Sequence, residues 1–162
     1  MLIGIISDSH GEVTRTRRAM HQLATHGCEK YIHLGDVETL EVLDELVGYD
    51  VYLVFGNCDW TSQLHDYAVN IGIHVRHPAD VITVEGKQLA FLHGHDERQY
   101  REFLNDGVAY LFHGHTHEKR DEMVNNTRCI NPGALHRAAV YTVAVLDTEL
   151  DAVTFLEVND YA

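Results

Sequence analysis

The sequence lacks the features that mark secreted, fibrous or membrane-spanning proteins. Its three cysteines form no Cys-x-x-Cys pair, and an odd number suits a reducing compartment better than a disulfide framework. Only two prolines occur and 45% of the residues are hydrophobic, which argues against a disordered or collagen-like chain. The apolar runs are too short for a membrane span or for the core of a signal peptide. We therefore expect a cytoplasmic protein with no membrane partner.

Basic residues are also scarce. The chain carries 25 acidic residues against 12 lysines and arginines, and its formal net charge is −13. Such a surface repels phosphate backbones at long range, so a nucleic-acid polymer is not expected as a partner. A small phosphate-bearing substrate is compatible with this charge if a local cationic centre binds it.

Strand-like and helix-like segments alternate in the first half of the chain. The predicted strands are residues 2–6, 31–34 and 51–55, and the predicted helices between them are residues 12–26 and 38–47. This order is typical of a parallel sheet with right-handed crossovers. Residues 60–78 are expected to form a polar connection to the second half.

The second half contains more hairpins. Its predicted strands are residues 81–84, 89–92, 108–112, 127–130, 139–146 and 152–158, and residues 97–104 are the predicted helix. The length is most simply that of a single domain, residues 1–162. We expect an α/β chain whose two β-rich halves form sheets packed face to face, with helices outside.

The most informative stretch is Phe112-His113-Gly114-His115-Thr116-His117, which directly follows an apolar strand. It presents His-x-His on a tight turn at a sheet edge, and neutral imidazole is the commonest protein ligand for borderline metals. Other predicted strands also end in polar side chains, and ligands of open α/β sheets bind beyond the carboxyl ends of the strands. The candidate metal ligands at these ends are Asp8, His10, Asp36, Asn57, His93, His115 and His117.

Seven ligands are too many for one ion. They suit two divalent ions about 3.5–4 Å apart that share a carboxylate, an arrangement used for in-line displacement at phosphorus. Nitrogen and oxygen donors without a required thiolate favour transition metals over calcium. Two such ions outweigh the charges of Asp8 and Asp36, so the loaded site would keep positive charge for a phosphate group.

Several polar residues have an ordinary structural interpretation instead. His33 and His113 lie within or directly after predicted strands and are expected to be buried, hydrogen-bonded core residues. The remaining histidines are expected at the surface without a role: His21, His26, His65, His74, His77 and His136. Three cations flank the site motifs and either contact phosphate or lie in solvent: Arg98, Lys119 and Arg120.

The whole motif series resembles the calcineurin-like metallophosphoesterase family. The matching motifs are Asp8-x-His10, Gly35-Asp36, Gly56-Asn57-Cys58-Asp59, His93 and Gly114-His115-x-His117. Their order and spacing, together with Asn131-Pro132-Gly133, are similar to the small prokaryotic phosphodiesterase branch of that family. The resemblance covers residues 1–158 and implies a four-layer αββα sandwich of two mixed β-sheets, with a dinuclear metal site.

The resemblance also implies an assignment of the ligands. One metal would take Asp8, His10, Asp36 and His117, and the other would take Asp36, Asn57, His93 and His115. Asp36 would bridge the ions, and a hydroxide bridging the two metals would be the nucleophile. Manganese is the first choice of metal, with nickel, iron, zinc and cobalt as alternatives. Family habit favours a homodimer or homotetramer.

The chain departs from the family pattern at Cys58, where many family phosphatases carry a histidine that protonates the leaving oxygen or steadies the transition state. A thiol is a poor mimic of imidazolium, so diesters or activated aryl esters are expected as substrates in preference to ordinary monoesters. The candidate catalytic residues are Asn57, Asp59 and His95. His95 is a possible replacement acid or simply lines the pocket, and Asp59 has an alternative role in binding loop amides.

Taken together, these patterns predict a metal-dependent phosphodiesterase that acts on a small phosphoester. The alternative is a non-catalytic, metal-binding scaffold or protein-interaction subunit on the same fold. A storage protein that binds metal without turnover is a third interpretation. Residues 60–78 and 97–106 are expected to shape the pocket wall, and they carry no recognisable substrate code.

Overall fold

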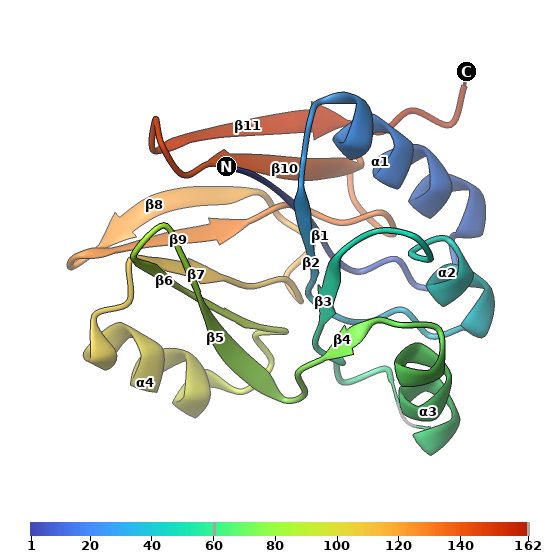
Figure 1. The fold of residues 1–162 in the computed structure, drawn as a ribbon, viewed down its shortest axis with the longest axis horizontal. Helices are drawn as coiled ribbons and strands as arrows, with labels where there is room; N and C mark the ends of the chain where they lie inside the picture. The colour runs from blue at the N-terminus through green and yellow to red at the C-terminus, as the bar shows by residue number, and fades with distance from the viewer. Residues whose placement is uncertain (60, 162) are drawn as a thin grey trace.

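The structure is a computed structural model that describes residues 1–59 and 61–161. Two mixed β-sheets form its centre, as Figure 1 shows. The six-stranded sheet has the order β11-β10-β1-β2-β3-β4, and the five-stranded sheet has the order β5-β6-β7-β9-β8.

The strands of the six-stranded sheet are β1 (Leu2–Ile6), β2 (Lys30–His33), β3 (Val51–Leu53), β4 (His74–Val75), β10 (Thr142–Asp147) and β11 (Ala152–Glu157). Those of the five-stranded sheet are β5 (Ala79–Val84), β6 (Lys87–Leu92), β7 (Tyr110–Phe112), β8 (Arg120–Val124) and β9 (Thr127–Asn131). The helices are α1 (Val13–Thr25), α2 (Leu40–Asp44), α3 (Ser62–Asn70) and α4 (Glu97–Asp106). Strands β1 to β4 run parallel, as do β6, β7 and β9, and the outer hairpins add the antiparallel pairs.

Three apolar layers hold four structural layers together. Between the sheets, alternate residues of β1 and β6 such as Ile3, Ile5 and Phe91 are fully buried. Helices α1 to α3 cover the outer face of the six-stranded sheet, where residues such as Leu23 pack. Helix α4 covers the outer face of the five-stranded sheet through side chains such as Phe103. The predicted αββα sandwich with two mixed sheets is confirmed, because apolar residues occupy both faces of the central strands.

The predicted polar connection over residues 60–78 is wrong for the part that the structure describes, residues 61–78; Trp60 lies outside it. Thr61 caps helix α3 by accepting a hydrogen bond from the backbone N–H of Leu64 at 3.4 Å, and β4 then joins the sheet beside β3. The helix buries few apolar side chains, among them Leu64 and Ala68. So weak an apolar stripe carries little periodic signal in the sequence.

Other boundaries differ by a few residues from those predicted. Helix α2 is shorter than residues 38–47, because the chain continues past Asp44 in tight turns. Strand β10 begins at Thr142 rather than residue 139, because the residues before it belong to a loop that reaches the cleft. Among the described residues, every helix is too short or too polar to span a membrane.

Candidate metal centre

The seven predicted ligands lie at the same end of the two sheets. Asp8 and His10 follow β1, Asp36 follows β2 and Asn57 follows β3, while His93 follows β6. The last two predicted ligands, His115 and His117, occupy the loop after β7. Because the carboxyl ends of parallel strands meet at one sheet edge, residues far apart in sequence become neighbours here.

The backbone at this edge is unusual. Five of the seven predicted ligands have φ between +40° and +69°, the left-handed region that residues with a Cβ rarely adopt: Asp8, His10, Asp36, His115 and His117. Non-glycine residues in this region carry strain, and they cluster at functional sites. The tight left-handed turns direct the side chains into a common space beyond the strands.

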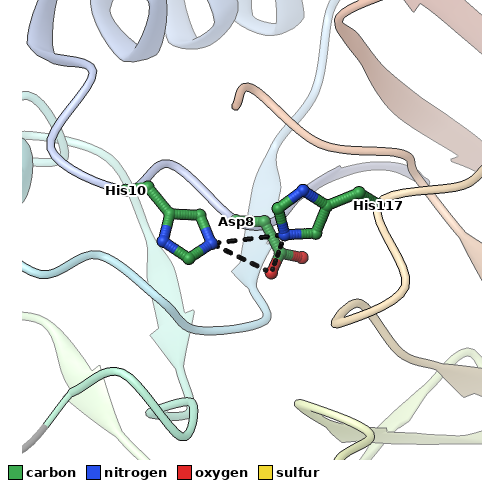
Figure 2. Close-up of side chains that lie close together, drawn as sticks. All are labelled: Asp8, His10 and His117. Carbon is green, nitrogen blue, oxygen red and sulfur yellow. Dashed lines mark hydrogen bonds and ion pairs between the residues drawn. The ribbon is translucent and has the colours of Figure 1, made fainter. Parts of the chain in front are cut away.

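One group of ligand atoms forms around Asp8. Its Oδ1 lies 3.2 Å from His117 Nε2 and 3.6 Å from His10 Nε2, and the two imidazole nitrogens are 3.3 Å apart. Figure 2 shows the two rings, one from the loop after β1 and the other from the loop after β7, with their facing nitrogens and the carboxylate oxygen at the corners of a triangle. All three residues present an atom to the same small volume.

A second group forms around Asp36. Its Oδ2 lies 3.2 Å from His93 Nε2 and 3.4 Å from His10 Nε2, so this carboxylate stands between the two groups. His93 Nε2 also lies 3.0 Å from Asn57 Oδ1. His115 completes a cluster with Asp36 and His93 whose possible ligand atoms all lie within 4.8 Å of one another.

Hydrogen bonds at the outer ring nitrogens orient two of these imidazoles. His93 Nδ1 donates to the backbone oxygen of Leu34 at 2.7 Å, and His10 Nδ1 donates to Glu38 Oε1, also at 2.7 Å. In the neutral rings the Nε2 lone pairs then face the carboxylates of the cleft. This tautomer is the one that metal-binding histidines use when a carbonyl or carboxylate holds their other nitrogen.

The carboxylate of Asp8 provides a test of whether a metal fits. It is fully buried, and its Oδ1 is the one buried side-chain oxygen or nitrogen within residues 1–59 and 61–161 that has no hydrogen bond of normal geometry. Its Oδ2 accepts hydrogen bonds from Ser7 Oγ at 2.5 Å and from the backbone N–H of His115 at 3.0 Å. Ligands bound at about 2.1 Å to one ion lie about 3.0–3.5 Å apart, close to most distances around Asp8 and Asp36. The donor set and its spacing fit divalent transition metals.

The charges of the cleft support the same conclusion. Burial opposes the charge on Asp8, but the imidazoles of His10 and His117 outweigh it and lower the pKa of this carboxyl below its usual range. Burial likewise opposes charge on His10, yet the carboxylates of Asp8 and Glu38 raise its pKa to about 9. The cleft thus favours positive charge between its carboxylates, which divalent ions would supply in place of protons.

The cleft has a volume of about 390 Å³, and three of its lining residues had no predicted role. Glu38 binds His10, while His136 lies with its ring centroid 5.0 Å from that of His10 and its Nδ1 3.1 Å from Glu12 Oε1. Arg137 also lines the cleft. His136, expected at the surface, is thus half-buried on the wall of the cleft. Its one sequence signal was its place directly after Asn131-Pro132-Gly133-Ala134-Leu135.

The candidate catalytic residues fall in different places. Asp59 accepts hydrogen bonds from four backbone N–H groups of the strand-end loops, at Asp36, Val37, Glu38 and Gly56. These contacts favour its alternative role in binding loop amides.

His95 is exposed at the rim, with its ring centroid 5.5 Å from that of His93. Cys58 lines the cleft, and its backbone N–H donates to Asp36 Oδ1 at 2.9 Å. Burial, followed by the nearby carboxylates of Asp36 and Glu38, raises the pKa of the Cys58 thiol to about 11.

The flanking histidines and cations separate into core and surface groups. His33 and His113 are buried as expected, His33 with its Nε2 2.8 Å from Ser9 Oγ. Arg98 bonds to Glu102 on α4, and Arg120 donates to the hydroxyl of Tyr100, so both face away from the cleft. Among the described residues, the side chain of Lys119 forms neither a hydrogen bond nor an ion pair.

A model of the calcineurin-like phosphoesterase superfamily domain matches residues 1–151. The chain belongs to the calcineurin-like phosphoesterase superfamily. It is accordingly a hydrolase that acts on phosphoric ester bonds, and the strand-end side chains are its candidate metal-binding residues. The predicted resemblance is confirmed.

Proteins similar to this chain match it over nearly their whole length. The chain is 31% identical to the phosphodiesterase MJ0936 of Methanocaldococcus jannaschii over 92% of this chain and 94% of that protein. A solved archaeal phosphodiesterase superposes with a TM-score of 0.88 at 25% identity, covering 97% of this chain and 99% of that one. The zinc complex of Vps29 from Entamoeba histolytica superposes with a TM-score of 0.67 at 20% identity, covering 100% of this chain and 95% of that one. This is a likeness of fold alone.

Proposed function

We propose that this chain is a metal-dependent phosphodiesterase that hydrolyses small phosphodiesters at a centre of two divalent ions. The observation that carries the proposal is the convergence of carboxylates and imidazoles around Asp8 Oδ1, a buried oxygen without a hydrogen bond. The similarity to a phosphodiesterase at 31% identity supports the choice of a diester.

The two groups of ligand atoms suggest how the ions would be held. Asp8, His10, Asp36 and His117 would hold one ion, and Asp36, Asn57, His93 and His115 would hold the other. Manganese is our first choice, with nickel, iron, zinc and cobalt as alternatives. When bound, the ions supply positive charge for the phosphoryl oxygens and make hydroxide available near neutral pH.

The chain's own residues would then position the substrate and move protons. Asn57 directs its Oδ1 toward His93, which leaves the amide N–H₂ to donate to a phosphoryl oxygen. His95 stands at the rim beside His93, where it can protonate a leaving oxygen. A Cys58 thiol whose pKa is about 11 keeps its proton at neutral pH, which favours leaving groups that need little help.

Hydrolysis of bis(p-nitrophenyl) phosphate against p-nitrophenyl phosphate tests the proposal. Protein stripped with a chelator and reloaded with manganese or nickel should hydrolyse the diester faster than the monoester. Asn57→Ala and His115→Ala should lower diester hydrolysis about 10²-fold or more. His21→Ala, on the exposed face of α1, is the matched control and should keep full activity.

The scaffold hypothesis makes the opposite prediction. A chain that binds two ions per molecule but hydrolyses neither ester with any of the metals would contradict a general phosphodiesterase. The likeness to Vps29 concerns the fold alone and does not favour the scaffold. The predicted dimer or tetramer is independent of this test, and light scattering would measure it.

A further inference from the structure

We propose that the cleft extends into a second anion-binding subsite, formed by Lys119 and Arg137, that binds a phosphate group of the substrate other than the one hydrolysed. The proposal rests on the phosphodiesterase activity proposed above and narrows its substrate class. The substrates would be phosphodiesters that carry a second phosphate, such as short nucleotides with a terminal phosphate.

The first observation concerns how the cations are paired. In the described part of the chain, ten of the twelve lysine and arginine side chains have a hydrogen-bond or ion-pair partner. The two without such a partner are Lys119 and Arg137. In a chain with a net charge of −13, cations that form neither a hydrogen bond nor an ion pair are unusual enough to need an explanation.

Both cations line one cavity beside the metal cleft. This cavity has a volume of about 410 Å³ and shares His117 and Arg137 with the cleft. Its remaining wall is apolar along residues 138–140, and Glu118 is its one acidic lining residue. Two cations against one acid leave net positive charge next to the candidate metal ligands.

The loop that carries Arg137 is anchored at the two residues directly before it. The backbone N–H of Leu135 donates to the backbone oxygen of Asp8 at 3.2 Å, and His136 is paired with Glu12. Arg137 itself has a φ of +46°, a left-handed conformation rare for arginine. Because the loop is fixed to the strand end of Asp8, the backbone of Arg137 is already in place, which lowers the entropy lost when a phosphate binds.

Lys119 reaches the same cavity from the loop after β7. Its Cγ lies 3.3 Å from where a Cβ on Gly133 would stand, so its stem packs against the turn that precedes Arg137. Its Nζ lies 5.4 Å from the ring centroid of Phe155. The aliphatic stem is therefore supported while the ammonium group keeps its hydrogen-bond donors free for an anion.

The dinucleotides pApA and ApA form a matched pair, because they differ in the terminal 5′-phosphate alone. With the manganese-loaded protein, we expect kcat/KM for pApA to exceed that for ApA about tenfold or more. Arg137→Gln and Lys119→Gln should each lower this ratio, and the double substitution should bring it close to one. Arg137→Lys should keep part of the preference. Arg98→Gln, an exposed arginine on α4, is the control and should leave the ratio unchanged.

Other outcomes separate this inference from the proposed function. Equal hydrolysis of the two dinucleotides by the native chain would overturn the subsite and leave the phosphodiesterase intact. An equal loss for both substrates in Arg137→Gln would overturn it too, because that arginine would then act on the reacting phosphate. If the native chain hydrolyses no diester, the proposed function fails. In that case, calorimetry measures the affinities of the metal-loaded protein for pApA and ApA and so tests the subsite without hydrolysis. Equal affinities would overturn the subsite.

Discussion

The two sheets contribute different chemistry to one cleft. Strands of the six-stranded sheet end in both carboxylates, the amide of Asn57 and one imidazole, whereas those of the five-stranded sheet end in imidazoles alone. Each set is oriented by the opposite sheet. His93 donates to the backbone oxygen of Leu34, and the backbone N–H of His115 donates to Asp8. The site is thus also a seam between the sheets, and neither half alone forms it.

Asp36, whose carboxylate belongs to both groups of ligand atoms, should have the largest effect on activity and on metal binding. Asp36→Asn keeps the shape and the hydrogen bond from the backbone N–H of Cys58 but removes the shared negative charge. We expect kcat/KM for a diester to fall about 10³-fold, together with the loss of at least one bound ion. Metal analysis and diester kinetics measure both. Asp106→Asn, exposed at the end of α4, should change neither, and an Asp36→Asn protein with two ions and near-native turnover would contradict the shared role.

The seam itself can be broken at Gly114. A Cβ there would lie 2.0 Å from Ser7 Oγ and 2.6 Å from Asp8 Oδ2, so the two strand ends approach too closely for any side chain. We expect Gly114→Ala to lower the free energy of unfolding by about 1–3 kcal/mol, because a fully packed contact must open. Chemical denaturation measures the change.

Gly86→Ala is the control for Gly114→Ala, since it adds a Cβ in open space at a left-handed hairpin turn. It measures the cost of a Cβ at a left-handed glycine in open space, a cost that Gly114 does not carry because its φ is not left-handed. An unchanged free energy of unfolding in Gly114→Ala would show that the sheets can separate there without penalty.

The six-stranded sheet also contributes Cys58, which follows β3 directly after Asn57. Cys58→His places an imidazole, which exchanges protons near neutral pH, on the rim of the cleft in place of a thiol with a pKa of about 11. We expect the ratio of monoester to diester hydrolysis to rise about tenfold. Cys58→Ser, which keeps a small neutral group, should leave the ratio close to native. A fall in the ratio for Cys58→His would remove proton transfer at this position as the cause of the substrate preference.

The strand ends could be predicted from the sequence because they depend on local patterns. Each candidate ligand follows a short apolar run, and the carboxyl ends of parallel strands meet wherever such runs form one sheet. Asp8 and His117 lie at opposite ends of the motif series, yet the pattern of strand ends alone assigns both to the cleft. The burial of both faces of the central strands likewise follows from their uniformly apolar sequences.

The rim could not be predicted in the same way. His136 and Arg137 reach the cleft because the chain turns back at Gly133, whose φ is +86° and where a Cβ would lie 2.0 Å from Thr142 Oγ1. That turn is a tertiary contact between a loop and β10, and no periodicity of the intervening residues indicates it. Helix α3 was missed for the related reason that few of its side chains are buried.

We expect the smallest effects from two buried histidines, one at a strand end of each sheet next to the site, which make stability depend on pH. Burial lowers the pKa of His33, the last residue of β2, and of His113, directly after β7, to about 4 in each case. His33 is held neutral because its Nδ1 accepts from the backbone N–H of Gly35. Their unfolded pKa is about 6.5, so this contribution to stability is complete above pH 6.5 and is lost as the pH falls toward 4. Imidazole NMR of the metal-free protein should show both rings titrating below pH 5, and a midpoint near 6.5 for either would contradict the buried neutral state.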